Sequence, residues 1–155
     1  MTGVQTCALP ISGRQELIRN YKGIKIYNDT NSTTPDAALV ALRSLSDSKK
    51  KNLVLICGGA DKNLDMTNFV KEIPKYCRNV VLLAGTGTEK FVKNFPLETK
   101  DFPVATDLKN AVKLAVGFAK KGDSLVLSPA FASFGMFKNE YDRGDKFVAL
   151  IKKLK

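Results

Sequence analysis

Three unbroken apolar runs of strand length constrain the fold of this chain more than any other feature. They are Asn52–Cys57, Asn79–Ala84 and Asp123–Leu127. A strand that is buried on both faces reads as a continuous apolar run, whereas a strand with one solvated face alternates. Each run is followed by a turn and then by apolar residues at helical spacing. This alternation predicts an α/β fold with a mostly parallel sheet.

The N-terminal part of the chain predicts a strand pair followed by a helix. Two short extended runs, Gln15–Tyr21 and Gly23–Tyr27, favour a hairpin. Further on, Thr34 is a suitable N-cap and Pro35 suits the first helical position. The sequence NDTNSTT therefore lies between a strand end and a helix N-terminus, where backbone N–H groups favour an anion. A capped turn without a ligand explains residues 29–34 equally well.

Helical spacing predicts further helices over residues 37–45, 64–76, 89–94 and 107–121, and an amphipathic closing helix. Pro74 argues against the last turn of the second of these helices, and Gly122 is expected to cap the fourth. Phe102–Ala105 predicts a short peripheral strand. The Gly85–Thr88 segment lacks the third glycine of a dinucleotide loop and the lysine of a P-loop, so we interpret it as a turn that caps a helix.

Two other strand ends carry residues that suit a ligand. Gly58–Gly59 allows close approach of the backbone, and Lys62 offers a point charge for a carboxylate. The loop after the last strand contains Ser128, Ser133 and a flexible Gly135. In open α/β sheets, ligands bind at the carboxyl ends of the strands. A surface lysine after a glycine turn is also common without a ligand, so these residues alone do not define a site.

Composition excludes several classes of function. The net charge of +10 comes mostly from lysines spread along the chain, a pattern that argues against nucleic-acid binding, for which clustered arginines are typical. No apolar run approaches the roughly 20 residues that cross a bilayer, so no membrane association is expected. The absence of histidine removes imidazole catalysis, and with it a serine hydrolase. Three cysteines without metal spacing suit reduced thiols and a cytoplasmic location.

Residues 1–12, MTGVQTCALPIS, carry no charge and no clear periodicity. They resemble the translation of a sequencing adapter, and we exclude them from the predicted domain, which spans residues 13–155. A disordered N-terminal tail is the alternative. Under the adapter interpretation, the natural chain continues upstream and this chain is a fragment.

Several segments together resemble one family. They are NDTNSTTP after the hairpin, GGADK after the Asn52–Cys57 run, and SPAFAS, FKN and RG near the C-terminus. This set is similar to the C-terminal domain of the Mur ligases, of the type that adds D-glutamate, over residues 14–155. The resemblance implies a Rossmann-like three-layer domain with a mostly parallel sheet. It also implies a bacterial, cytoplasmic and monomeric enzyme of peptidoglycan synthesis.

The resemblance assigns roles residue by residue. The residues implied to bind D-glutamate are Thr33, Lys62, Ser133 and the backbone near Phe134. The residues implied to bind nucleotide are Arg14, Asp29 and Asn31, the last of which replaces a lysine of many relatives. Arg143 is expected to pair with a nearby acid. No catalytic or metal-binding residue is carried over to this chain.

The reaction implied by the resemblance is an ATP-dependent ligation. ATP with Mg²⁺ phosphorylates the carboxylate of UDP-N-acetylmuramoyl-L-alanine, and the amine of D-glutamate displaces the phosphate. The UDP-binding and central ATPase domains of the family are absent from this sequence, so the chain is expected to fold but not to catalyse ligation alone. The alternatives are the C-terminal domain of another Mur ligase or of a folylpolyglutamate synthase, and a stand-alone Rossmann-like module that binds a small ligand.

Overall fold

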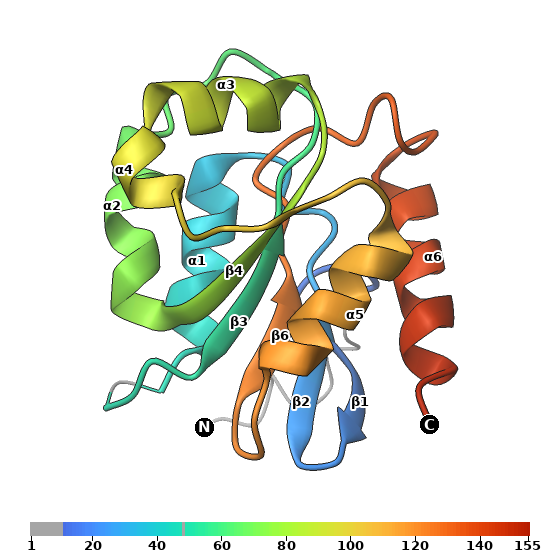
Figure 1. Ribbon diagram of the computed structural model, residues 1–155. Helices are drawn as coiled ribbons and strands as arrows, with labels where there is room; N and C mark the ends of the chain where they lie inside the picture. The colour runs from blue at the N-terminus through green and yellow to red at the C-terminus, as the bar shows by residue number, and fades with distance from the viewer. Residues whose placement is uncertain (1–10, 48) are drawn as a thin grey trace, which may run out of the picture.

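A computed structural model describes residues 11–47 and 49–155 (Figure 1). Residues 1–10 of the predicted tail lie outside the described residues, whereas Ile11 and Ser12 are exposed. The remaining chain forms one mixed sheet with helices on both of its faces. This three-layer α/β arrangement confirms the predicted fold class.

The sheet has six strands in the order β1-β2-β6-β3-β4-β5. The strands are β1 (Glu16–Tyr21), β2 (Ile24–Asn28), β3 (Leu53–Cys57), β4 (Cys77–Leu83), β5 (Val104–Ala105) and β6 (Ser124–Leu127). β1 and β2 form the predicted antiparallel hairpin, and every other neighbouring pair is parallel. β6, the last strand in the chain, is therefore inserted between β2 and β3, which brings its C-terminal loop into the middle of the sheet edge.

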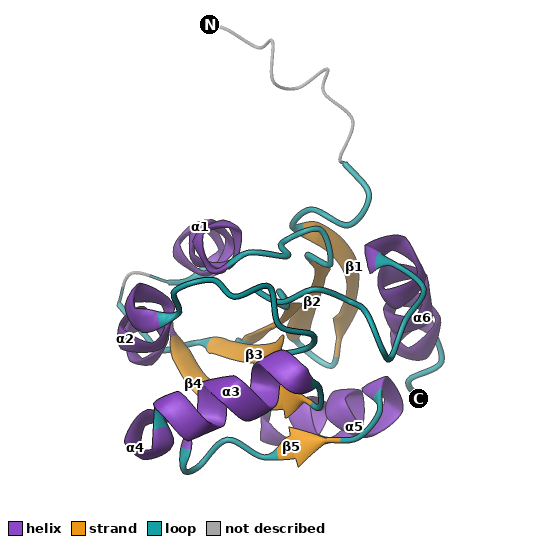
Figure 2. Cartoon of the chain, turned by 90° about the horizontal axis from the view of Figure 1, so that it is seen from above, coloured by secondary structure: helices purple, strands orange, loops and turns teal. Residues whose placement is uncertain are grey.

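In the part of the chain that the structure describes, six helices flank the sheet (Figure 2). They are α1 (Pro35–Leu45), α2 (Thr67–Tyr76), α3 (Thr86–Asn94), α4 (Pro96–Thr99), α5 (Leu108–Phe118) and α6 (Glu140–Lys152). α1 and α2 cover one face, and α5 and α6 cover the other. α1 begins as predicted, because the Thr34 side chain accepts a hydrogen bond from Ala37 N and Pro35 occupies the first turn.

The central strands are buried on both faces, as their unbroken apolar runs predict. In β3, Leu53, Leu55 and Cys57 join the core beneath α1 and α2, while Val54 and Ile56 join the core beneath α5 and α6. Successive side chains of a strand point to opposite faces, so one apolar run supplies both cores. The two cores fix the strand ends and hence the position of the loops that follow them.

Some helix boundaries differ from the predictions. α2 continues through Pro74 to Tyr76, because proline removes one N–H but the helix retains its packing through Phe69 and Ile73. α5 ends at Phe118, and Gly122 lies in the turn before β6 with φ +96° instead of capping the helix. α3 begins at Thr86, three residues earlier than predicted, for a reason that belongs to the site. α4 is a short helix that the sequence did not predict.

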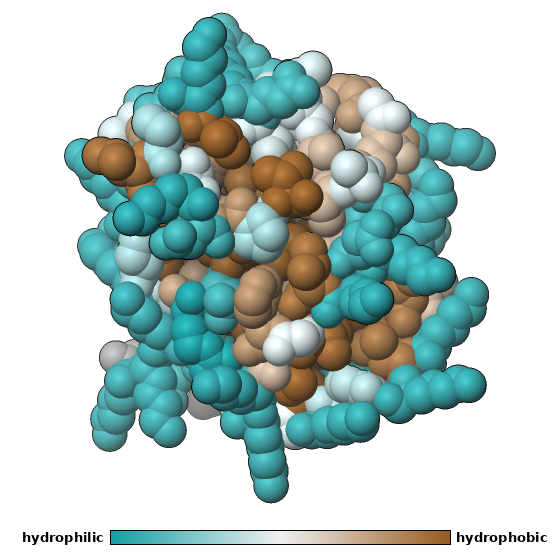
Figure 3. Space-filling model, in the orientation of Figure 1, coloured by the Kyte–Doolittle hydropathy of each residue, from teal (hydrophilic) through white to brown (hydrophobic). Residues whose placement is uncertain are grey.

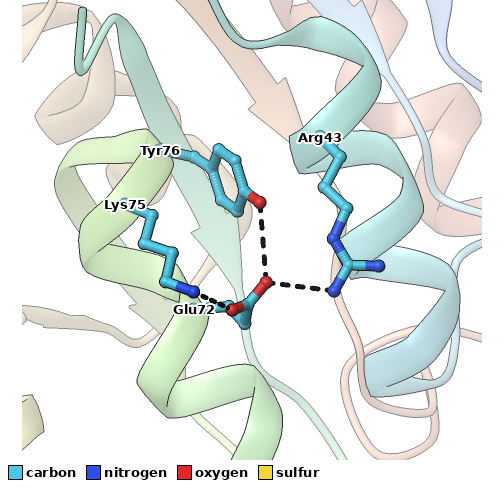
Figure 4. Close-up of polar contacts among 4 residues, drawn as sticks. All are labelled: Arg43, Glu72, Lys75 and Tyr76. Carbon is cyan, nitrogen blue, oxygen red and sulfur yellow. Dashed lines mark hydrogen bonds and ion pairs between the residues drawn. The ribbon is translucent and has the colours of Figure 1, made fainter. Parts of the chain in front are cut away.

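α1 and α2 are joined on their outer side by an ion cluster (Figure 4). The Glu72 carboxylate accepts hydrogen bonds from Arg43 at 3.0 Å, Lys75 at 2.5 Å and Tyr76 at 3.5 Å. These bonds from both cations lower the pKa of Glu72. The cluster is exposed on the Arg43 and Lys75 side, and surface pairs of this kind contribute little to stability. We therefore interpret it as a solvated contact between two helices.

The opposite side of the molecule carries apolar side chains among lysines (Figure 3). Leu97, Val104 and Leu114 are the exposed large hydrophobic residues of α4, β5 and α5. No helix in the described part of the chain is long and apolar enough to span a membrane.

Candidate functional site at the carboxyl edge of the sheet

Three loops meet where β2, β3 and β6 end, and backbone hydrogen bonds connect them. Asp29 N donates to Leu127 O at 2.8 Å, and Ala130 N donates to Ser32 O at 2.8 Å. Ala60 and Ala132 form a two-way antiparallel bridge of 2.9 and 3.2 Å. The β2–α1, β3–α2 and β6–α6 loops therefore form one continuous rim, because β6 lies between β2 and β3.

The start of α3 packs against the β3–α2 loop of this rim, which explains why the helix begins earlier than predicted. Gly59 O accepts hydrogen bonds from Gly87 N at 2.9 Å and Thr88 N at 3.2 Å, so the β3–α2 loop supplies an acceptor for the free N–H groups of the first turn of α3. Gly59 has φ +149°, and a Cβ at this position would collide with Ala132 O. Glycine is therefore required for the close approach of the β3–α2 and β6–α6 loops.

The residues predicted to bind D-glutamate lie on this rim. Lys62 Nζ is 3.3 Å from Thr33 Oγ1 and 3.4 Å from Thr33 O, although 29 residues separate them in sequence. Ser133 follows the bridge residue Ala132 and is 5% exposed. Phe134, next to it, is 70% exposed. The geometry brings the three loops together, while the binding roles of these residues stay predictions.

A small hollow of about 10 Å³ lies beside Ser133, between the β3–α2 loop, the β6–α6 loop and the end of β4. Its lining includes Gly58, Gly59, Ala132, Ser133, Phe134 and Arg143. A larger hollow of about 610 Å³ lies between α1 and α2, but helix residues line it and no residue of the three loops does. We therefore place the candidate site at the rim.

The residues predicted to bind nucleotide form a second group, beside β2. Asn31 N donates to Gly13 O at 2.9 Å and Asn31 Nδ2 donates to Ser12 O at 3.1 Å, so residues 12–15 run along the β2–α1 loop. Gln15 N donates to Asp29 Oδ1 at 3.0 Å, and Arg14 is exposed beside it. The structure thus brings Arg14, Asp29 and Asn31 together. Their contact with nucleotide stays a prediction.

Asp29 is fully buried and holds the loops from inside. Its Oδ2 accepts hydrogen bonds from Ser32 Oγ at 2.5 Å and from Ser128 Oγ at 2.7 Å. Burial raises the pKa of Asp29, and the hydrogen bonds from Ser32, Ser128 and Gln15 oppose that rise. The carboxylate therefore supports the β2–α1 and β6–α6 loops and exposes no surface to solvent.

Arg143 corrects one expectation and was missed as a site residue. No acidic side chain of the described residues forms an ion pair with it, so the predicted acid partner is wrong. Its guanidinium instead contacts Thr30 and Phe131 O, one residue from each of two rim loops. Gly144 follows it because a Cβ there would meet Thr30 Cγ2 at 2.6 Å. The RG pair near a helix start was the sequence signal of this packing.

Acidic and thiol side chains occur at this edge, among them Asp29, Asp61 and Cys57. Within residues 11–47 and 49–155, no group of three histidine, cysteine or acidic side chains is placed to hold a metal ion. Cys57 and Cys77 are buried free thiols, and burial raises the pKa of Cys77 to about 12. The rim carries the Lys62 ammonium and the hydroxyl groups of Thr33 and Ser133, groups that can form hydrogen bonds with an anion.

The fold and this edge define a class of protein: a three-layer α/β domain whose candidate ligand site is a rim built from the loops after its parallel strands. A family described as "Mur ligase, glutamate ligase domain" matches residues 13–131. The chain belongs to this family.

Relatives in sequence agree with this assignment. The chain is 40% identical over 144 residues to a UDP-N-acetylmuramoylalanine–D-glutamate ligase of Roseiflexus sp., and covers 30% of that protein. It is 37% identical over 147 residues to the ligase of the same name from Caldanaerobacter subterraneus, and covers 32% of it. These alignments include 91% and 94% of the chain. The chain thus spans about a third of the length of the curated relatives it matches.

Solved structures share the fold at low sequence identity. The MurF ligase of Thermotoga maritima in complex with ADP superimposes with a TM-score of 0.63 at 18% identity, over 95% of this chain and 32% of that one. The folylpolyglutamate synthase of Mycobacterium tuberculosis, also complexed with ADP, gives 0.62 at 12% identity, over 92% of this chain and 33% of that one. At this identity the likeness concerns the fold alone.

Proposed function

We propose that this chain binds the incoming D-glutamate in the ATP-dependent ligation of D-glutamate to UDP-N-acetylmuramoyl-L-alanine. The observation that carries the proposal is the contact of Lys62 with Thr33, together with the bridge between Ala60 and Ala132. Both join loops that are distant in sequence. The relatives that are 35–40% identical are named as ligases for this reaction, which supports the same substrate.

The rim residues suit a small dicarboxylic amino acid. Lys62 supplies an exposed ammonium, Thr33 and Ser133 supply hydroxyl groups, and the backbone at Phe134 supplies an N–H. Hydrogen bonds from charged donors to a carboxylate are roughly twice as strong as those between neutral groups. We assign Lys62 and Thr33 to one end of the ligand and Ser133 with Phe134 N to the other.

In the proposed reaction this chain positions D-glutamate and forms one wall of the nucleotide site. Arg14 is exposed and Asn31 is half-buried beside it, and both would contact ATP, while Asp29 holds their loop from inside. ATP, bound with Mg²⁺, supplies the phosphoryl group that activates the substrate carboxylate. The ATPase and UDP-binding parts of a bacterial, cytoplasmic and monomeric enzyme would supply the groups that bind the metal and transfer the phosphoryl group.

Titration of the isotope-labelled chain with D-glutamate tests the proposal. We expect amide shifts at residues 33, 62, 133 and 134, and weaker binding in Lys62→Met and Ser133→Ala. Removing one partner of a charge-assisted hydrogen bond costs about 1.5–3 kcal/mol, which is roughly a tenfold to hundredfold loss of affinity.

Lys71→Met is the matched control, because Lys71 is an exposed lysine of α2 in the groove beside α1. It should bind D-glutamate as the unchanged chain does. L-Glutamate serves as the ligand control and should shift the rim amides less than the D-isomer. Shifts that spread over the lysine-rich surface, or an equal loss in the Lys71 variant, would show nonspecific attraction to the net charge.

A further inference from the structure

A buried arginine without an acidic partner sits directly beneath the proposed site. Arg143 is 1% exposed and lies in the first turns of α6. A buried charge is costly unless its hydrogen bonds are formed, and pairing with an opposite charge is the usual remedy. Burial lowers the pKa of Arg143 to about 10, so it remains positively charged at neutral pH.

Within the described residues, each hydrogen bond of this guanidinium reaches one of two loops of the rim. Nε donates to Thr30 Oγ1 at 3.0 Å and Nη2 donates to Thr30 O at 2.9 Å. Nη1 donates to Phe131 O at 3.3 Å. Thr30 Oγ1 in turn donates to Glu140 O at 2.7 Å, which ties the same loop to the start of α6. One planar group therefore fixes the distance between the loop that carries Thr33 and the loop that carries Ser133.

The charge of Arg143 also faces the site. Arg143 lines the hollow that contains Ser133, Gly58 and Gly59, and its hydrogen-bond acceptors are all neutral oxygens. Neutral acceptors satisfy the N–H groups without cancelling the net charge. Glu140, three residues earlier in α6, attracts that charge electrostatically but forms no ion pair with it. The field of a buried charge is screened less than that of a surface lysine.

We propose that Arg143 is a positioning residue of the amino-acid site: it holds the β2–α1 and β6–α6 loops in register and supplies fixed positive charge behind Ser133. The inference rests on the proposed function for the identity of the ligand. The loop-holding part concerns the ligand-free chain and can be measured without any ligand.

The test compares Arg143→Lys, Arg143→Met and the control Arg78→Met. Arg78 is a partly buried arginine that binds Asp123 and Phe118 O at the opposite edge of the sheet. In the ligand-free chain, amide hydrogen exchange at residues 29–33 and 130–133 should accelerate in both Arg143 variants and not in Arg78→Met. Unchanged exchange in Arg143→Met would overturn the loop-holding role.

The affinity for D-glutamate distinguishes the charge of Arg143 from the shape of its side chain. Arg143→Met should bind about tenfold more weakly, the effect expected for removal of a unit charge about 10 Å from an ionised ligand at an effective dielectric constant of about 20. Arg143→Lys keeps the charge and should lie within about threefold of the unchanged chain, whereas a purely structural role predicts equal losses. The electrostatic role would be overturned if the unchanged chain, Arg143→Lys and Arg143→Met bound D-glutamate equally, or if the two Arg143 variants lost affinity equally.

The loop-holding role can still be tested if Arg143→Met does not fold or if the unchanged chain does not bind D-glutamate. If Arg143→Met does not fold, Thr30→Val removes the hydroxyl that accepts from Arg143 Nε and donates to Glu140 O while keeping the charge of Arg143, and should accelerate exchange in the same loops. Slow exchange in Thr30→Val would then contradict the loop-holding role. If the unchanged chain does not bind D-glutamate, the proposed function and the electrostatic role both fail, while the exchange data still decide the loop-holding role.

Discussion

Asp29 is a buried side chain that connects separate segments of the chain at the candidate site. Its carboxylate accepts hydrogen bonds from Gln15 N, Ser32 Oγ and Ser128 Oγ, which come from three separate segments. The sequence placed Asp29 correctly at the end of β2, because an apolar run ends there. It did not reveal the inward direction of the carboxylate, because that direction depends on Ser128, which is 99 residues away.

The raised pKa of Asp29 predicts a pH dependence. Between the ordinary value of 3.8 and the higher folded value, the folded chain keeps a proton that the unfolded chain has released. The contribution of Asp29 to the free energy of unfolding is therefore present at low pH and falls as pH rises through this window. Asp29→Asn lacks this contribution.

Urea unfolding of the unchanged chain and of Asp29→Asn, from about pH 4 to about pH 7, measures the contribution of Asp29 to the free energy of unfolding. The stability of Asp29→Asn relative to the unchanged chain should increase with pH across the window and then level off. Parallel stability curves, or a relative stability that decreases with pH, would contradict the raised pKa.

At the scale of elements, features set by local sequence were predicted, whereas features set by contacts between loops were not. The unbroken run of β3 and the cap at Thr34 are local patterns, so both were predicted. The start of α3 was not, because Gly87 N and Thr88 N bind Gly59 O of another loop. The predicted end of α5, at residue 121, was also wrong. The helical pattern of the sequence continues past Phe118, but the residues after it form the turn to β6.

Two neighbouring threonines at the start of α1 have different predicted roles, one in stability and one in binding. Thr34 accepts the capping hydrogen bond from Ala37 N at 3.2 Å, whereas Thr33 contacts Lys62. Thr34→Ala should lower the free energy of unfolding by about 1 kcal/mol, the usual value of an N-cap. Thr33→Ala should leave stability within about 0.5 kcal/mol, as surface changes do, and weaken D-glutamate binding. Urea unfolding and ligand titration of both variants measure this, and equal destabilisation would refute the assignment.

At the scale of the whole molecule, insertion of β6 between β2 and β3 is what makes one rim from three loops. The chain order predicts parallel strands but not their order in the sheet, because similar apolar runs can exchange places. The resemblance of NDTNSTTP, GGADK and SPAFAS to one family supplied the expectation that these loops converge. The packing of Arg143 against Thr30 and Phe131 required the sheet order and was therefore beyond the sequence.

Because the three rim loops belong to this chain, D-glutamate binding should need no other polypeptide, whereas ligation should. A ligand that binds the folded state at a hundred times its Kd adds about 2.7 kcal/mol to stability. For a domain of this size, that corresponds to a rise in Tm of roughly 5–10 °C. L-Glutamate at the same concentration should raise Tm less.

ATP with Mg²⁺ and UDP-N-acetylmuramoyl-L-alanine, added to the same sample, should release no phosphate. The sequence contains no GK[ST] P-loop motif, the usual means of holding the β- and γ-phosphates of a nucleotide. We therefore predict binding without phosphoryl transfer for this chain. Phosphate release that depends on D-glutamate would locate catalytic groups within this chain and refute it.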